Sequence, residues 1–106
     1  MTLYEILTDP EAGVKMPCAY SHFRGEKVPK KPPYMVYIGE GQNNAEADNT
    51  YYYSQNRYQI EYYFIDKDEE AEARIEQLLL SNGFLYEKSE DVFIESEGVS
   101  VIYYTI

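Results

Sequence analysis

The residues of this chain that could do chemistry are mostly carboxylates, and three of them share one segment. Glu40, Glu46 and Asp48 lie in a stretch rich in glycine and asparagine, and oxygen ligands of this kind can hold Ca²⁺. Their order does not match the pattern of an EF-hand loop. We therefore favour a solvated loop over a calcium site, and we expect no cofactor.

Other catalytic groups are scarce. The chain has one histidine, His22, and one cysteine, Cys18, which cannot fill the four-ligand shell of a zinc site. Ser21 beside His22 formally offers a nucleophile and a base, but no motif supports a catalytic triad. We expect His22 in an ordinary strand position and Cys18 as a small buried or edge residue. The glycines around residue 40 lack the spacing of a phosphate loop. We therefore predict that the protein is not an enzyme and has no small-molecule substrate.

The charge of the chain is strongly acidic and unevenly placed. The net charge is −10 over 106 residues. Residues 61–97 hold twelve acids against three bases, whereas residues 24–31 hold four bases against Glu26. An acidic body repels phosphates, so we expect no sequence-specific nucleic acid binding. The short basic segment could dock on an acidic patch of another protein.

The sequence also lacks membrane and export signals. It contains no run of about 18 apolar residues, and its start lacks the basic and apolar regions of a secretory signal. A lone cysteine suits a reducing compartment. These features predict a cytoplasmic protein with no membrane partner.

An aromatic strand followed by a helix forms the expected centre of the fold. Tyr58, Ile60, Tyr62 and Phe64 alternate with polar residues and Tyr63, the pattern of a strand with one buried face. The apolar positions of residues 71–79 then recur at helical spacing. Asp66 or Asp68 can cap this helix, and Asn82-Gly83 can end it. We expect its acids to form the solvent-exposed face of the helix; they are Glu69, Glu70, Glu72 and Glu76.

The remaining segments predict an α+β fold in a single domain, residues 1–106. We expect a mostly antiparallel sheet of four to five strands packed with two helices, in the order α-β-β-β-α-β-β. In chain order, the expected elements are a helix over 3–8 capped by Thr2, strands over 18–23, 34–38 and 51–65, a helix over 68–82, and a C-terminal hairpin of 84–94 and 99–106. Residues 39–49 are expected to form a long loop. The last strand is apolar on both faces, which favours either a central place in the sheet or pairing with a partner chain.

Thirteen tyrosines are the most informative excess in the composition. Tyrosine combines apolar area with a polar tip and is enriched at protein–protein interfaces. Tyr58 and Tyr62 fall on one face of the central strand and Tyr63 on the other. Because one helix cannot cover both faces of a sheet, we expect a second surface for self-association or a partner.

The order of elements, with Pro33-Tyr34-Met35-Val36-Tyr37 and Asn49-Thr50-Tyr51-Tyr52-Tyr53, resembles a known family. The chain is similar to the small tail-completion, tail-terminator and head–tail joining proteins of long-tailed bacteriophages and prophages. The resemblance implies a structural protein that forms a ring, commonly a hexamer, at the head-proximal end of the tail. Such a ring ends tube polymerisation and joins the tail to the head connector. It also implies tail-tube or head-connector proteins as partners, in the bacterial host cytoplasm during assembly and in the virion tail or neck afterwards.

The residues expected to contact neighbouring proteins come from the basic segment, the long loop and the tyrosines. They are Arg24, Lys27, Lys30, Lys31, Glu40, Gln42, Asn43, Asn44, Asp48, Tyr51, Tyr52, Tyr53 and Tyr63.

Two other functions remain open on the sequence. An acidic phage protein could be a DNA mimic that inhibits a nucleic-acid-binding protein, although residues 24–31 would interrupt its decoy surface. A small enzyme working through Glu61 or the C-terminal acids is the third interpretation.

Overall fold

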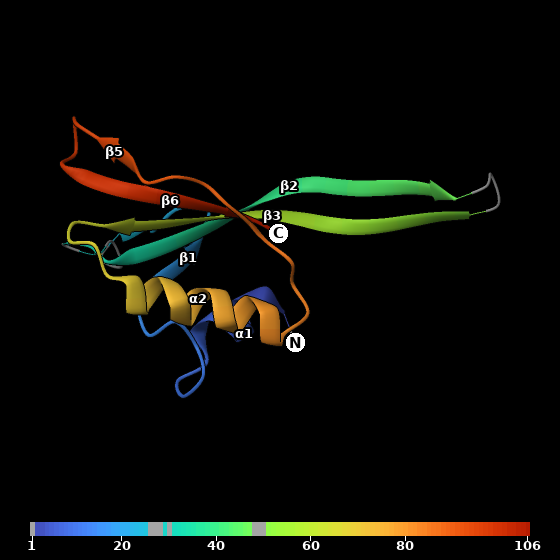
Figure 1. The fold of residues 1–106 in the computed structure, drawn as a ribbon, viewed down its shortest axis with the longest axis horizontal. Coiled ribbons are helices and arrows are strands. Elements are labelled where there is room, and N and C mark those ends of the chain that lie inside the picture. The colour runs from blue at the N-terminus through green and yellow to red at the C-terminus, as the bar shows by residue number, and fades with distance from the viewer. Residues whose placement is uncertain (1, 26–28, 30, 48–50) are drawn as a thin grey trace.

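The fold is one six-stranded sheet with two helices packed on the same face (Figure 1). The computed structural model describes residues 2–25, 29, 31–47 and 51–106, and for 41–47 and 51–56 it describes the backbone alone. The elements are α1 (Leu3–Thr8), β1 (Cys18–Tyr20), β2 (Tyr34–Ala47), β3 (Tyr51–Phe64), α2 (Glu69–Ser81), β4 (Glu87–Lys88), β5 (Val92–Ile94) and β6 (Val99–Thr105). The expected α+β class is confirmed, with more strands than predicted.

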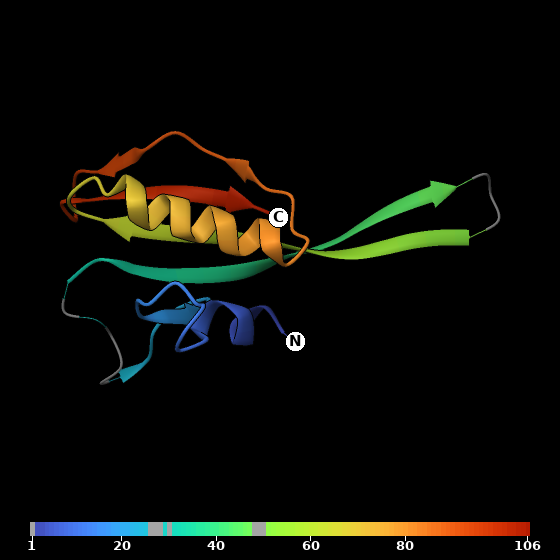
Figure 2. The same cartoon turned by 60° about the horizontal axis from the view of Figure 1, so that its bottom comes forward.

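The sheet runs in the order β1-β2-β3-β6-β4, with β5 also paired to β6. All of these pairs are antiparallel except β1 with β2, which is parallel. The apolar strand β6 lies between β3 and the short strands β4 and β5, so its predicted central position is confirmed. Figure 2 shows how both helices lie across the body half of the sheet.

Both helices begin where their sequence signals indicate. Thr2 and Glu5 form a capping box, in which the Glu5 N–H donates to Thr2 Oγ1 at 3.2 Å and the Thr2 N–H to Glu5 Oε1 at 3.1 Å. Asp68 Oδ1 accepts from the first backbone N–H groups of α2. The helix ends at Asn82, followed by Gly83 at a φ of +84°, a conformation that costs glycine little.

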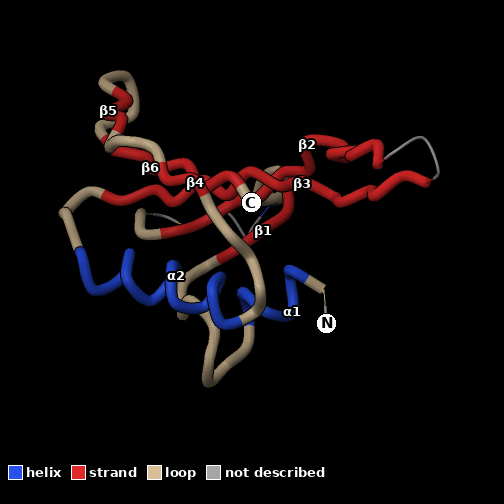
Figure 3. The backbone as a smooth tube through the Cα atoms, turned by 45° about the vertical axis from the view of Figure 1, so that its right-hand side comes forward, coloured by secondary structure: helices blue, strands red, loops and turns tan. Residues whose placement is uncertain are grey.

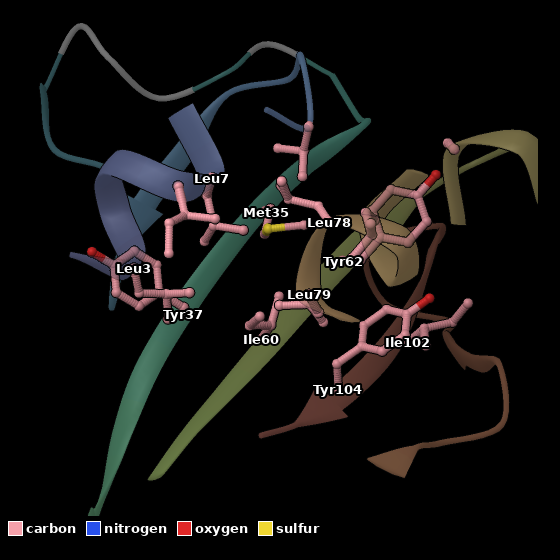
Figure 4. Packing of buried hydrophobic residues seen from close by; sticks show 14 of the residues in the cluster. Leu3, Leu7, Met35, Tyr37, Ile60, Tyr62, Leu78, Leu79, Ile102 and Tyr104 are labelled. Atoms are coloured by element: carbon pink, nitrogen blue, oxygen red, sulfur yellow. The ribbon is translucent and has the colours of Figure 1, made fainter. Parts of the chain in front are cut away.

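The core lies between the helices and the sheet face that they cover (Figure 4). Alternate residues of the three long strands point into it, as the period of a strand requires. These are Met35 and Tyr37 from β2, Ile60, Tyr62 and Phe64 from β3, and Ile102 and Tyr104 from β6, packed against Leu3, Ile6 and Leu7 of α1 and Ala71, Ile75, Leu78 and Leu79 of α2.

The prediction of a loop over residues 39–49 is wrong for the part that the structure describes. β2 continues to Ala47, and its outer half pairs with residues 51–56 of β3. A bulge between Gly39 and Gln42 places one extra residue on β2, and the ladder then resumes. Continuing the ladder gives the backbone N–H and C=O groups hydrogen-bond partners in the protein, whereas in a loop they would bond to water. The many tyrosines of β3 also have a high propensity for strands. We call the paired segments 42–47 and 51–56 the arm.

Two further element boundaries differ from the prediction. β1 ends at Tyr20 because Ser21 takes a φ of +68°, so His22 follows the strand and does not belong to it. The predicted strand at residue 84 begins only at Glu87. The Phe84 N–H still donates to Leu79 O at 2.9 Å, which ties this residue to the end of α2.

The arm makes the molecule elongated. Its Cα radius of gyration is 15.2 Å and its extents are 50 × 32 × 30 Å, whereas a compact chain of this length has a radius of about 13 Å. Figure 1 shows the arm projecting beyond both helices.

We predict that Leu79→Ala lowers the free energy of unfolding by about 2–5 kcal/mol, because Leu79 is fully buried and its truncation leaves a cavity. Urea denaturation measures this change. The neighbouring Leu80→Ala is the control, since Leu80 is 45% exposed, and its loss should stay below about 1 kcal/mol. Equal losses would contradict the placement of α2.

Candidate protein-interaction surface

Both helices lie on one face of the sheet (Figure 3), and aromatic side chains from β2, β3 and the segment after β1 pack together on the other face. Tyr34 and Tyr63 are register partners, and their rings stack with centroids 5.0 Å apart. Phe23 packs edge-on against Tyr34 at 5.7 Å. All three side chains are half-buried. The expectation that Tyr63 lies on the face opposite Tyr62 is therefore confirmed, and the structure brings Tyr63 together with aromatic neighbours from two other segments.

A carboxylate lies within this surface. The Tyr63 hydroxyl donates to Glu61 Oε1 at 2.5 Å. Burial, aided by this hydrogen bond, raises the pKa of Tyr63 well above its ordinary value. Tyr63 therefore stays protonated and acts as a hydrogen-bond donor, which suits a polar contact set in an apolar surface.

The other expected contact residues are spread along the molecule. Glu40 is exposed at the base of the arm, and Gln42, Asn43 and Asn44 lie in its β2 strand. Tyr51, Tyr52 and Tyr53 lie in its β3 strand, in register with Ala47, Glu46 and Ala45. Lys27, Lys30 and Asp48 lie outside the described residues. Of the basic residues, Arg24 and Lys31 are exposed.

The structure does not bring the basic segment and the arm tip of one chain together. Lys31 precedes the start of β2, and Ala47 ends this strand at the other end of the molecule (Figure 1). A single surface containing both would therefore need two copies or a partner.

The prediction that the acids of α2 form a solvent-exposed face is wrong for Glu72 and Glu76. The side chain of Glu72 is 4% exposed and lies between two lysines, with Lys67 Nζ at 2.8 Å from Oε2 and Lys88 Nζ at 2.9 Å from Oε1. Lys88 Nζ also lies 2.8 Å from Glu76 Oε2. Nothing in the local sequence signals this cluster, since Lys67 and Lys88 lie on either side of α2 in the chain and meet only in the fold.

Glu76 completes the network through two tyrosines. The hydroxyls of Tyr104 and Tyr86 donate to its two carboxylate oxygens at 2.8 and 3.2 Å. Burial alone would raise the pKa of Glu76, but the hydrogen bonds from Lys88 and Tyr104 hold it below its ordinary value. Burial and the same carboxylate raise the pKa of Tyr104. Glu76 is thus held as a carboxylate and Tyr104 as a protonated hydroxyl, so the network fits a structural tie between α2 and the sheet.

The arrangement of metal-ligating side chains and the environment of the single cysteine bear on the chemistry open to the described part of the chain. No three His, Cys, Asp or Glu side chains among those residues are placed to hold a metal ion. Cys18 is half-buried in β1, and burial raises its pKa to about 11, so it is a protonated thiol at neutral pH. Neither of the helices in the described ranges is long and apolar enough to cross a membrane.

Comparison with known proteins gives no relative. No protein-family model, no curated protein and no solved structure matches the chain significantly.

We predict that replacing both Lys67 and Lys88 with methionine lowers the free energy of unfolding by about 3–5 kcal/mol, because Glu72 is left as an uncompensated buried charge. Each single substitution should cost about 1 kcal/mol, since the other lysine still neutralises Glu72. A double-mutant cycle by urea denaturation measures the coupling, with exposed Lys15→Met as the control. Strictly additive losses would contradict a shared carboxylate.

We predict that Glu76→Gln lowers the free energy of unfolding by about 1–2 kcal/mol at pH 7. A carboxylate whose pKa is lowered by folding stabilises the protein above its ordinary pKa and loses this effect as the pH falls through the lowered value. The difference in stability between the two proteins should therefore shrink as the pH falls below the ordinary pKa of a glutamate, about 4.3, and should vanish below the lowered pKa of Glu76. Denaturation at several pH values measures this, and a difference that persists in acid would point to lost packing instead. Exposed Glu70→Gln is the matched control.

Proposed function

We propose that this protein is a structural assembly protein of a long-tailed phage or prophage. In this proposal it forms an oligomeric ring at the head-proximal end of the tail, ends tube polymerisation and joins the tail to the head connector. The proposal rests on the resemblance in the sequence and on surfaces that a single copy leaves uncovered.

The observation that carries the proposal is the arm. Within the described residues, 42–47 and 51–56 pair with each other and with no third strand, since β1 meets β2 at residues 35–37 and β6 meets β3 at residues 59–64. An isolated two-stranded hairpin is at best marginally stable in water, and free strand edges readily pair with another chain. An arm of this kind is suited to a role in which a neighbouring protein covers it.

Two other features agree with assembly. The aromatic surface around Tyr34 and Tyr63 lies on a sheet face that no helix covers, which suits a protein contact. The net charge of −10 is compatible with a ring whose lumen is acidic, and such a lumen would let DNA pass without phosphate contacts.

We predict that light scattering across a concentration series detects a discrete oligomer, with a hexamer as the expected size. Screening by moderate salt should favour the oligomer, because it weakens repulsion between acidic copies. A monomer at every concentration and salt would contradict self-assembly and favour the acidic inhibitor.

We predict that the oligomer depends on the arm and that the body does not. Replacing residues 41–56 with Asn-Gly joins Glu40 to Arg57 through a two-residue turn and keeps the register of Gly39 with Tyr58. This variant should be monomeric, while its free energy of unfolding stays within about 1 kcal/mol of the full chain at concentrations where both are monomeric. An oligomer that survives the deletion would assign assembly to another surface.

A further inference from the structure

A groove with exposed aromatic walls runs along the free edge of β1. It has a volume of about 460 Å³ and is lined by Tyr4, Pro17, Cys18, Tyr20, Phe23 and Arg24, among others. Tyr4 and Tyr20 are 49% and 54% exposed, so two large aromatic residues face water beside one another at this edge. Exposed aromatic area of this kind marks a contact surface more often than a solvated one.

The backbone beside the groove keeps outward-facing N–H groups for a further strand, while Tyr20 O already accepts from the His22 N–H at 2.7 Å. Pro17 O accepts from the Met35 N–H at 2.9 Å, and the Ser21 N–H donates to Tyr37 O at 2.8 Å. Since alternate residues of a strand bond to the same neighbour, the odd-numbered residues of β1 face β2. The N–H groups of Cys18 and Tyr20 therefore point to the outer edge. Within the described residues β1 pairs with β2 alone, so an extended segment could add to the sheet here.

The arm has the chemistry and the length that this groove requires. Its sequence consists of amides, alanines, a serine and three tyrosines, and Glu46 is its one charged residue. Each strand of the arm spans about 20 Å, more than the length of β1. Arg24 borders the groove and can pair with Glu46, whereas acids such as Glu69 and Glu70 on α2 would repel it.

An arm placed in the groove would have to come from a second copy. The arm leaves the body in the direction away from β1, and a paired two-stranded ribbon cannot fold back onto its own base (Figure 1). Arm and groove are different surfaces, so their contact is head-to-tail. Contacts of this kind close into rings when the rotation between copies allows it.

We propose that the arm of one copy docks along the β1 edge groove of the next copy, extending its sheet and pairing Glu46 with Arg24. This inference rests on the proposed function, because it names the contact by which the ring would form.

Photo-crosslinking tests the contact. The photoreactive residue p-benzoylphenylalanine replaces Tyr52 in the arm, and ¹⁴N and ¹⁵N chains are mixed so that crosslinks between copies carry a mixed mass. We expect crosslinks between copies that map to residues 4 and 17–24. The control places the same residue at Leu85, which is 84% exposed and does not line the groove, and it should not capture those residues.

The outcomes separate the two proposals. An oligomer whose arm crosslinks elsewhere, for example to another arm, overturns the docking site and leaves the ring standing. A protein that is monomeric by light scattering and gives no crosslink between copies overturns both.

A charge reversal gives a second, independent readout. Arg24→Glu should raise the dissociation constant of the oligomer about 5- to 10-fold at low salt, and moderate salt should reduce the effect. Arg74→Glu makes the same change in net charge on the exposed face of α2 and should have little effect. Adding Glu46→Lys to Arg24→Glu should restore most of the affinity, and equal weakening by the two arginine variants would overturn the pairing.

Discussion

The structure depends on a mismatch of length between its strands and its helices. β2 and β3 have 14 residues each, or about 46 Å, while the 13 residues of α2 span about 20 Å. The helices can therefore cover only the body half of one sheet face. The opposite face and the arm remain outside the core. The fold therefore consists of a body that contains the core and of two surfaces that do not contribute to it.

A network of ion pairs and hydrogen bonds joins α2 to the sheet in this small body. Glu72 is buried between Lys67 and Lys88, and Glu76 accepts hydrogen bonds from Tyr86 and Tyr104. Such a network contributes less free energy than an apolar core of equal volume, but its directional contacts join α2 to residues on both sides of it in the chain. The network fixes α2 against β4 and β6, at the side of the sheet where the strands are shortest.

Local signals in the sequence predicted much of this fold because they act over a few residues. The alternation around Tyr62, the caps at Thr2 and Asp68, and the glycine after α2 each determine their own turn or strand. The arm was missed because asparagine and glycine favour turns locally, whereas pairing with the tyrosines of β3 is a non-local interaction. The burial of Glu72 was missed for the same reason. The groove beside β1 could not be predicted either, since it combines residues from α1, β1 and the turn after it.

The separation of arm and body also bears on how such a protein can change over generations. The apolar cluster formed by the described side chains lies in the body, and the backbones of residues 42–47 and 51–56 pair with each other. Selection for a stable fold therefore constrains these two segments weakly, and selection for binding can act on them almost alone. When a binding partner changes, substitutions at about a dozen positions of the arm could restore binding while the body stays the same.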